Sequence, residues 1–336
     1  MKISVTAFKA WKDCRRRWFL AHKMGLEPAT PQTPLLFGSG IHAALGKYYR
    51  KRGGLLEDYF RDWMEENIFL LKHKLGPSYE LFRSEIDQLL ITGLGVLKHY
   101  QTWAEAEGRD DFEVIDTEIN FEVPVADGLL FKGRIDGLIR MPNGLLWILE
   151  HKTASNFGNL EWTAYDAQCT GYVWAAGQLA DSPVQGMVFN FLRKEVPQPP
   201  KVLANGMLSK DKRQLTTLEL YKQALFEGHH NTAQYAEILA HLERRENPYF
   251  QRIWESRNRT QTSQWLDQFV IVAREMQSCS IYPNQGFHCS WCPFESPCHA
   301  LDLGANVDAA LAMYRIRDRD ADEDFLPAAE VDWSSI

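Results

Sequence analysis

The chain lacks the features that mark a membrane, secreted or nucleotide-hydrolysing protein. No run of about 18 apolar residues is present, which excludes an ordinary transmembrane helix. The first twenty residues mix basic and apolar side chains and contain no uninterrupted apolar segment of a secretion signal. The pattern Gly-X-X-X-X-Gly-Lys-Ser/Thr is missing as well, which argues against an ATPase. We therefore expect a soluble, cytoplasmic protein that does not enter a membrane.

Cysteine is scarce, with six residues among 336. Three of them form a C-x2-C-x5-C cluster at Cys289, Cys292 and Cys298, and such a cluster needs a fourth thiol to complete a metal site. On spacing alone, Cys14 and Cys279 both remain candidates for that fourth thiol. Because disulfides are rare in the cytoplasm, we expect four thiolates that hold either Zn²⁺ or an iron-sulfur cluster, which spacing does not distinguish.

Charge is distributed unevenly along the chain, whose formal net charge is -7. Residues 1–53 hold eleven Lys or Arg against two acidic residues, whereas residues 318–336 hold seven acidic residues against one Arg. The basic segment is expected to attract phosphates, and the acidic tail, 316–336, is expected to be disordered. The residues expected to contact a DNA backbone are Arg15, Arg16, Arg17, Lys47 and Arg50.

These basic residues have a simpler alternative explanation, which is that they cover solvated helix faces. Trp18, Tyr48 and Tyr49 lie among them. The three rings either stack on unpaired bases or face the protein core, and the sequence leaves both possibilities open.

A β-hairpin is predicted around the turn at residues 142–144, because apolar strand-like segments precede and follow this Pro-Asn-Gly sequence. A three-residue loop centred on Asn143 would place Asp136 opposite Glu150, with their Cβ atoms roughly 4.5 to 5.5 Å apart. Side chains alternate along a strand, so Glu150 and Lys152 would share one face.

The opposed carboxylates of Asp136 and Glu150 indicate a metal site. Two carboxylates this close repel each other, so a hard cation such as Mg²⁺ or Mn²⁺ is the simplest group that would hold them together. Lys152 would stand beside that cation and could orient a water or neutralise charge on a phosphate. The alternative is a surface hairpin in which Glu150 and Lys152 form a solvated ion pair.

Two helical patterns supply further polar side chains. Residues 38–50 begin with glycines and Ser39 and place His42 in the first helical turn, where a neutral imidazole could be a third metal ligand. In the second pattern Gln168 and Tyr172 are four residues apart and share a helix face. Taken singly, each is also an ordinary helix residue.

Taken in order, His42, Asp136, Glu150-X-Lys152 and Gln168-X-X-X-Tyr172 resemble the RecB-type branch of the PD-(D/E)XK nucleases. This branch includes the nuclease domains of bacterial recombination helicase-nucleases and the CRISPR-associated exonucleases related to them. The resemblance spans nearly the whole chain.

The resemblance implies a role for each motif residue. His42, Asp136 and Glu150 would bind the divalent cation. Lys152 would be the catalytic lysine. The residues that would support the site or the nucleic-acid strand are Gln168 and Tyr172. Glu118 falls where the family often has an acidic residue on the strand before the hairpin, so it is a possible further site residue.

The resemblance also bears on the cysteines. In this family a lone N-terminal cysteine and a late C-x2-C-x5-C triplet hold a 4Fe-4S cluster, which favours Cys14 over Cys279 and iron over zinc. Such ligation would join segments separated by some 280 residues, so we expect the cluster to be structural first.

The implied fold is α/β, with a mixed central β-sheet flanked by helices in a restriction-endonuclease-like core. Helical insertions and an iron-sulfur lobe that joins the N- and C-terminal segments would complete one nuclease unit over residues 1–315. Helical periodicity in 55–107, 217–246 and 262–278, and a strand pattern in 184–192, agree with this fold. The expected parts are a helical insertion at 55–107, a catalytic core at 110–195, a helical part at 215–280 and the cysteine cluster at 289–298.

The implied function is that of a Mg²⁺- or Mn²⁺-dependent DNA exonuclease that acts on single-stranded ends in recombination, repair or CRISPR-type processing. Helicase, recombination or CRISPR proteins would be its partners. Two alternatives remain: a catalytically silent DNA-binding or assembly subunit, and a zinc-stabilised scaffold whose carboxylates are structural.

Overall fold

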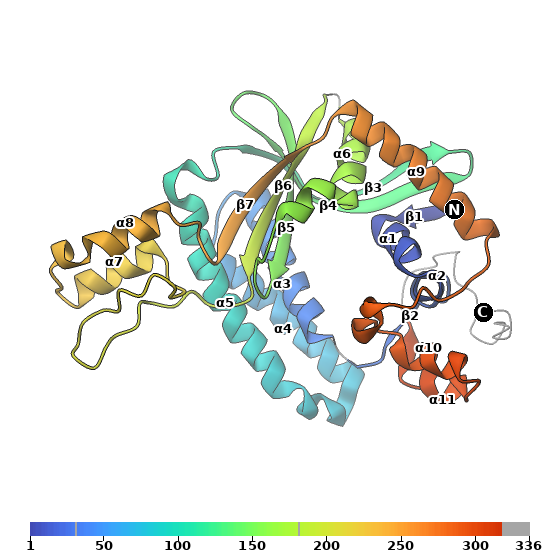
Figure 1. Cartoon of the computed structure of the whole chain (residues 1–336), viewed down its shortest axis with the longest axis horizontal. Helices are drawn as coiled ribbons and strands as arrows, with labels where there is room; N and C mark the ends of the chain where they lie inside the picture. The colour runs from blue at the N-terminus through green and yellow to red at the C-terminus, as the bar shows by residue number, and fades with distance from the viewer. Residues whose placement is uncertain (31, 181, 318–336) are drawn as a thin grey trace.

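The computed structural model describes residues 1–30, 32–180 and 182–317. At its centre is a mixed β-sheet with the strand order β1-β4-β5-β6-β7, and β3 also pairs with β4 (Figure 1). The strands are β1 (Lys2–Ser4), β3 (Glu113–Ala126), β4 (Leu129–Arg140), β5 (Leu146–Ala154), β6 (Val184–Arg193) and β7 (Phe250–Ser256).

Strand β4 changes its partner along one edge. Strand β3 pairs antiparallel with β4 along nearly its whole length. On the opposite edge, β1 pairs with residues 130–132 and β5 pairs with residues 137–140. Residues 133–136 therefore lie between two partner strands, and this split in the sheet positions the site described below.

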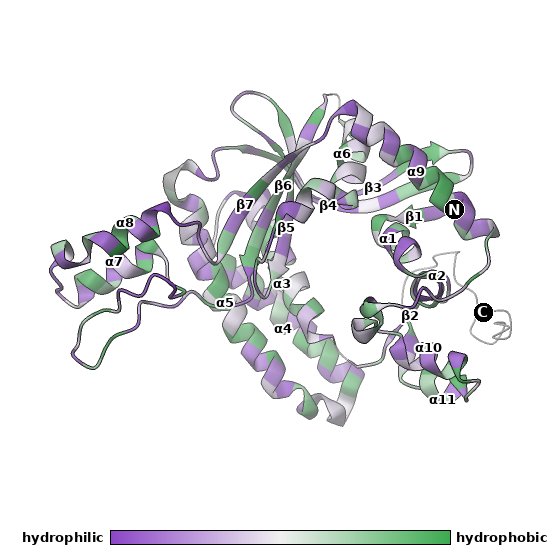
Figure 2. Cartoon of the chain, viewed as in Figure 1, coloured by the Kyte–Doolittle hydropathy of each residue, from purple (hydrophilic) through white to green (hydrophobic). Residues whose placement is uncertain are grey.

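Helices cover both faces of the sheet (Figure 1). On one face, α1, α6 and α9 pack over a core that includes Phe131, Phe189 and Trp265. On the other face, α3, α4 and α5 pack over Ile139 and Leu149. These helices are α1 (Val5–Asp13), α3 (Thr33–Lys51), α4 (Leu56–Leu75), α5 (Arg83–Glu105), α6 (Ala167–Leu179) and α9 (Arg259–Ser278). Figure 2 shows α4 and α5 banded with hydrophobic and hydrophilic residues, as expected for helices with one face on a core.

The predicted fold class, a mixed central sheet flanked by helices, is confirmed. The helical patterns in 55–107, 217–246 and 262–278 correspond to helices, and the pattern in 184–192 corresponds to β6. Strand β7 was not predicted, and it lies inside the segment expected to be helical. Short 3-10 helices connect the larger elements: η2 (Gly76–Leu81), η3 (Ala106–Gly108) and η4 (Glu161–Tyr165).

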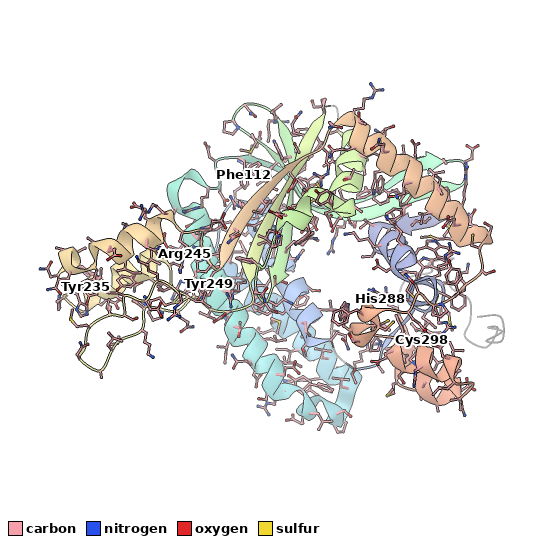
Figure 3. The ribbon with its side chains drawn as sticks, in the orientation of Figure 1. Phe112, Tyr235, Arg245, Tyr249, His288 and Cys298 are labelled. Atoms are coloured by element: carbon pink, nitrogen blue, oxygen red, sulfur yellow. The ribbon has the colours of Figure 1, made fainter. Side chains whose placement is uncertain are left out.

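A small helical lobe is inserted between β6 and β7. It contains α7 (Leu218–Glu227), η5 (Thr232–Tyr235) and α8 (Ala236–Arg244). The lobe has its own core, with Leu208, Tyr221 and Tyr235 buried together. Tyr235 and Arg245 mark the lobe in Figure 3, and Tyr249 marks the point where the chain returns to the sheet. Its two connections are adjacent, because the backbone N–H of Arg193 donates to the carbonyl of Tyr249 at 2.9 Å.

A second lobe, here called the cysteine lobe, combines residues from both ends of the described chain. Strands β2 and β8 pair antiparallel, and Leu20, Met24 and Phe294 form a small core beneath them. Its elements are α2 (Arg15–Trp18), η1 (Phe19–Lys23), β2 (Leu26–Pro28), η6 (Phe287–Trp291), α10 (Glu295–Asp302), α11 (Val307–Leu311) and β8 (Tyr314–Ile316). The predicted acidic tail lies outside the described residues from 318 onward. Among the described helices, none combines the length and apolarity needed to cross a bilayer.

Candidate active site

The predicted hairpin forms with the predicted register. The Met141 N–H donates to the Leu145 carbonyl at 2.9 Å, which leaves the loop centred on Asn143. The ladder pairs Gly137 with Leu149, and the same register continued by one residue would set Asp136 opposite Glu150. The strands part there, and the backbone N–H of His151 donates instead to Asp136 Oδ2 at 2.8 Å.

Tyr172 of α6 lies at the split in the sheet. Burial and the nearby charge of Glu150 raise the pKa of its hydroxyl, whereas the backbone of Arg134 and the side chain of Gln168 lower that pKa in part. Gly133 makes room for this side chain, because a Cβ at this position would lie 2.9 Å from the Tyr172 hydroxyl and 2.7 Å from the Phe121 ring. Tyr172 therefore lies beside the stretch of β4 that has no second neighbouring strand, on the same helix as Gln168.

Glu150, Lys152 and Gln168 form a closed triangle of hydrogen bonds. Lys152 Nζ donates to Glu150 Oε1 at 2.7 Å and to Gln168 Oε1 at 2.9 Å. Gln168 Nε2 donates to Glu150 Oε1 at 2.7 Å. Gln168 is fixed by the start of α6, where Asp166 caps the helix by accepting from the Cys169 N–H at 2.8 Å. Both hydrogen bonds of the carboxylate converge on Oε1, and the buried Oε2 of Glu150 has no hydrogen-bond partner.

His42 of α3 completes this arrangement from the other side. Its Nδ1 lies 3.1 Å from Asp136 Oδ2. Burial by itself would raise the pKa of Asp136, but His42 and the His151 N–H outweigh burial and lower it. Burial would lower the pKa of His42, but the nearby carboxylate of Asp136, and to a smaller extent that of Glu150, raises this pKa above its usual value.

Glu150 shows the opposite behaviour to Asp136. Burial and the nearby Asp136 charge raise the pKa of Glu150 above its usual range, even with Lys152 beside it. Burial would lower the pKa of Lys152, but Glu150 reverses the shift and keeps the ammonium protonated. The chain therefore buries two acids whose joint ionisation needs more positive charge than Lys152 alone supplies.

His151 points to the opposite face of the sheet from Glu150. Its Nδ1 lies 3.0 Å from Asn190 Nδ2, which in turn donates to the Tyr100 hydroxyl at 2.8 Å. Burial lowers the pKa of His151 to about 3, so the ring is neutral. Arg252 of the unpredicted strand β7 closes this network against Asp110 at 2.5 Å. The network fixes the backbone of His151, whose N–H holds Asp136.

Glu118 lies beside the site on β3. Thr117 pairs with Gly137 and Ile119 pairs with Ile135, so Glu118 lies next to Asp136 on the neighbouring strand. Its φ of 54° is left-handed, which is uncommon for a residue other than glycine. Its Oε2 pairs with Arg134 Nε at 3.0 Å, and its buried Oε1 has no hydrogen-bond partner. Arg134 was not predicted, although its position two residues before Asp136 on the same strand could have indicated it.

The side chains at this site are of the types that bind a hard divalent cation. Within the described residues, no three His, Cys, Asp or Glu side chains already converge as ligands around one point. However, Asp136, Glu150 and His42 lie together, and the unpartnered Glu150 Oε2 is the kind of atom that such a cation binds.

The family model described as the PD-(D/E)XK nuclease superfamily matches residues 2–299. The chain belongs to the PD-(D/E)XK nuclease superfamily. It is similar to the crystal structure of SSO0001, at 13% identity and a TM-score of 0.32, over 88% of this chain and 84% of that one. It is also similar to the protein named "Putative exonuclease" from Eubacterium rectale, at 12% identity and a TM-score of 0.39, over 74% of this chain and 84% of that one. No curated protein matches the chain.

In this member of the nuclease superfamily, four cysteines from distant segments line one cavity of about 250 Å³ in the cysteine lobe. They are Cys14, Cys289, Cys292 and Cys298, and Cys279 is not among the lining residues. Figure 3 places Cys298 and His288 in this lobe.

Several N–H groups point at these sulfurs. The Asn284 backbone N–H donates to Cys14 Sγ, and the Gly286 N–H donates to Cys289 Sγ, each at 3.4 Å. Burial raises the pKa of the Cys292 thiol, so a bound metal would be needed to hold it as a thiolate at neutral pH. The residues fit a thiolate-ligated group.

The basic residues predicted to contact DNA differ in their environments. Arg16 is only 6% exposed and pairs with Asp302 at 2.6 Å, so its burial excludes the direct phosphate contact predicted for it. Its Nη1 also donates to Cys298 Sγ at 3.4 Å, which makes it part of the cysteine lobe. Arg15 lies over the rings of Trp11 and Tyr282, at 5.0 and 4.7 Å from the ring centroids.

The remaining predicted contacts are closer to solvent. Arg17 lies 3.7 Å from Asp13 and is one-third exposed. Lys47 and Arg50 are exposed on α3. Of the two possibilities for the nearby aromatic residues, the structure supports the core, because the rings of Trp18, Tyr48 and Tyr49 are all buried.

Proposed function

We propose that the chain is a Mg²⁺- or Mn²⁺-dependent deoxyribonuclease that hydrolyses phosphodiester bonds at the ends of single-stranded DNA. Membership of the nuclease superfamily supports the nuclease activity. The observation that carries the catalytic assignment is the ion pair of Lys152 with the buried Glu150, whose carboxylate keeps one unpartnered oxygen beside Asp136.

The proposed ligands of the cation are His42, Asp136 and Glu150, and Glu118 is a third acidic residue beside them. When bound, a divalent cation would neutralise charge on the scissile phosphate and favour ionisation of an attacking water.

The chain's own groups position the reactants. Lys152 keeps a positive charge beside the site, where it can stabilise the negative charge that develops on the phosphate during hydrolysis. Gln168 holds both Lys152 and Glu150, so it fixes the direction of the ammonium group. Tyr172 packs beside Gly133 on the strand that carries Asp136. Partner helicases would supply the single strands.

The test uses end-labelled single-stranded oligonucleotides, with Mn²⁺ or with EDTA. We expect Asp136→Ala and Lys152→Ala to lower the cleavage rate by at least about a thousandfold, because each removes a group that acts on the reacting phosphate. Binding to the same strands, measured by fluorescence anisotropy, should change only a few-fold.

The matched controls are Asp87→Ala and Lys72→Ala, which remove an exposed carboxylate on α5 and a lysine at the far end of α4. They should retain wild-type rates. Full activity of either site variant would contradict the assignment, and a wild-type chain that binds strands without cutting them would indicate the silent subunit instead.

We further propose that Cys14, Cys289, Cys292 and Cys298 hold a 4Fe-4S cluster. Two observations support this proposal. The four cysteines line one cavity, and backbone N–H groups donate to the sulfurs of Cys14 and Cys289.

Anaerobic purification followed by an absorbance scan near 400 nm tests the cluster, because zinc thiolates do not absorb there. We expect a brown protein whose colour is lost in Cys292→Ser and kept in Cys279→Ser. A colourless wild-type protein that contains stoichiometric zinc would contradict the proposal.

A further inference from the structure

A pocket of about 310 Å³ lies between α3, α4 and β3. Its volume is at the lower end of the range for small-molecule sites, roughly 300 to 1,000 Å³, which suits a single nucleotide. The lining residues that matter here are Lys47, Arg50, Lys51, Tyr59, Trp63 and Glu118. We call it the α3–α4 pocket.

The pocket shares a wall with the candidate active site. Helix α3 carries His42 on one side and Lys47 about one turn later. Glu118 belongs to both places, since it lies beside Asp136 in the sheet and also lines the pocket. Its unpartnered Oε1 lies against Gly46, where an added Cβ would come within 3.1 Å of it. A DNA strand that crosses the candidate active site can therefore place its next nucleotide in this pocket.

Two lysines in the pocket carry charge that the described chain does not neutralise. Lys47 and Lys51 are four residues apart on α3, and their ammonium groups lie 5.6 and 5.3 Å from the centroid of the same ring, Tyr59. Neither forms an ion pair with a carboxylate among the described residues, although Glu66 also lines the pocket. Like charges four residues apart destabilise a helix slightly, and a bound anion would remove that cost.

Two other residues that line the pocket are Trp63, which is aromatic, and Arg50, which already has partners in the protein. Trp63 is partly exposed and supplies an apolar surface of the kind on which unpaired bases stack. Arg50 is engaged with β3, because it donates to the Thr117 carbonyl and lies 3.6 Å from Asp116. It holds the pocket wall in place and leaves the anion to the two lysines.

We propose that the α3–α4 pocket binds the nucleotide next to the cleaved bond, with its phosphate between Lys47 and Lys51 and its base against Trp63. This inference rests on the proposed nuclease function and extends it. The pocket would set the distance between the bound phosphate and the scissile one, and thereby which bond is cut.

The experiment uses the full chain with its metal cofactors and end-labelled single-stranded oligonucleotides that carry one neutral methylphosphonate at successive positions. In the wild type, one position beside the cut should lower kcat/KM by roughly tenfold or more, as expected for loss of a charge-assisted contact. In Lys47→Ala/Lys51→Ala, activity on the unmodified strand should fall by a similar factor, mainly through KM. The same methylphosphonate should then have little further effect.

Two further variants separate this pocket from general charge attraction. Lys47→Arg/Lys51→Arg keeps the charge and should retain the position dependence. Lys72→Ala/Lys74→Ala is the matched control, because Lys72 also lies over a tyrosine ring, at 5.3 Å from the Tyr79 centroid, but outside the pocket. It should behave as the wild type. An unchanged methylphosphonate profile in the Lys47→Ala/Lys51→Ala variant, or an equal loss in the control, would overturn the proposal.

Failure of the nuclease function itself would look different. If the wild type cuts no strand, the same oligonucleotides can be bound in EDTA and followed by anisotropy. A position-specific loss of affinity that disappears in the Lys47→Ala/Lys51→Ala variant supports the pocket, and identical profiles for the two proteins reject it.

Discussion

At the scale of single residues, Glu150 carries the strongest signal. Its Oε1 accepts from Lys152 and Gln168, while Oε2 is buried without a partner. A buried carboxylate oxygen in this state costs free energy in the folded protein unless a cation or a proton occupies it. Glu150 is therefore suited to binding a cation, and it lowers the stability of the metal-free protein.

Replacing this carboxylate should stabilise the metal-free protein. We expect Glu150→Gln to raise the free energy of unfolding in EDTA by about 1 to 2 kcal/mol, because an amide relieves the repulsion from Asp136. The wild type should gain thermal stability when Mn²⁺ is added, and the variant should gain much less. Thermal unfolding with and without Mn²⁺ measures both effects.

The control for this prediction is Glu122→Gln, which removes an exposed carboxylate paired with Lys2, both about half exposed. It should change stability by less than about 0.5 kcal/mol and leave the response to Mn²⁺ intact. A lower melting temperature of Glu150→Gln in EDTA would show that the charged form is the stabilising one.

At the scale of elements, the change of partner along β4 creates the site. The split leaves room for the Asp136 carboxylate to accept from the His151 backbone and for the Tyr172 side chain to lie against Gly133. Gly133 is the residue that permits this arrangement, because any larger side chain there would meet Phe121 and Tyr172.

Gly133→Ala should therefore destabilise the fold by about 1 to 3 kcal/mol, the usual cost of overpacking. Gly137→Ala on the same strand is the matched control. Its added Cβ would lie 3.5 Å from Leu149 Cβ, an ordinary contact, so its cost should be well below 1 kcal/mol. Urea denaturation midpoints of the two variants give the comparison, and equal midpoints would argue against the role of Gly133.

Elements formed by nearby residues could be predicted from the sequence, whereas pairings across long separations could be predicted only where a family motif joins the residues. The hairpin register followed from Asn143 and its flanking strands, because loop length and apolar alternation fix it locally. The insertion of β1 beside β4 joins residues about 130 apart, and nothing in the short β1 segment indicates it. Arg16 gave a similar error, since its charge predicted exposure while its partner Asp302 is 286 residues away.

In the candidate site too, some residues could be predicted from the sequence and others could not. His42, Asp136, Glu150 and Lys152 were expected to act together, and the structure places them together. The residues that hold them were missed, because support from Arg252 or Arg134 depends on tertiary packing rather than on a motif.

At the scale of the whole molecule, the cysteine lobe joins the start of the described chain to its last segment. Cys14 and the triplet at 289–298 line one cavity, and the strand pair β2–β8 connects the same two regions. A cluster there would restrict the unfolded chain strongly, since it would close a loop of about 280 residues.

Loss of the cluster should open this lobe before the sheet unfolds. We expect Cys14→Ser to lower the melting temperature and to make residues 279–302 the first segment cut by limited proteolysis, while β3 to β6 stay protected. Cys279→Ser should retain the wild-type cleavage pattern and melting temperature. Mass spectrometry of the early fragments identifies the cut sites, and first cuts within the sheet would contradict this order of opening.

The lobe between β6 and β7 has a consequence of another kind. Its entry and exit are held side by side by the hydrogen bond from Arg193 to Tyr249, and its apolar residues are buried among themselves. Natural selection can therefore lengthen, shorten or exchange this segment without disturbing the carboxylates at the split. The size and sequence of this lobe would then be free to change at a different rate from the residues of the candidate active site.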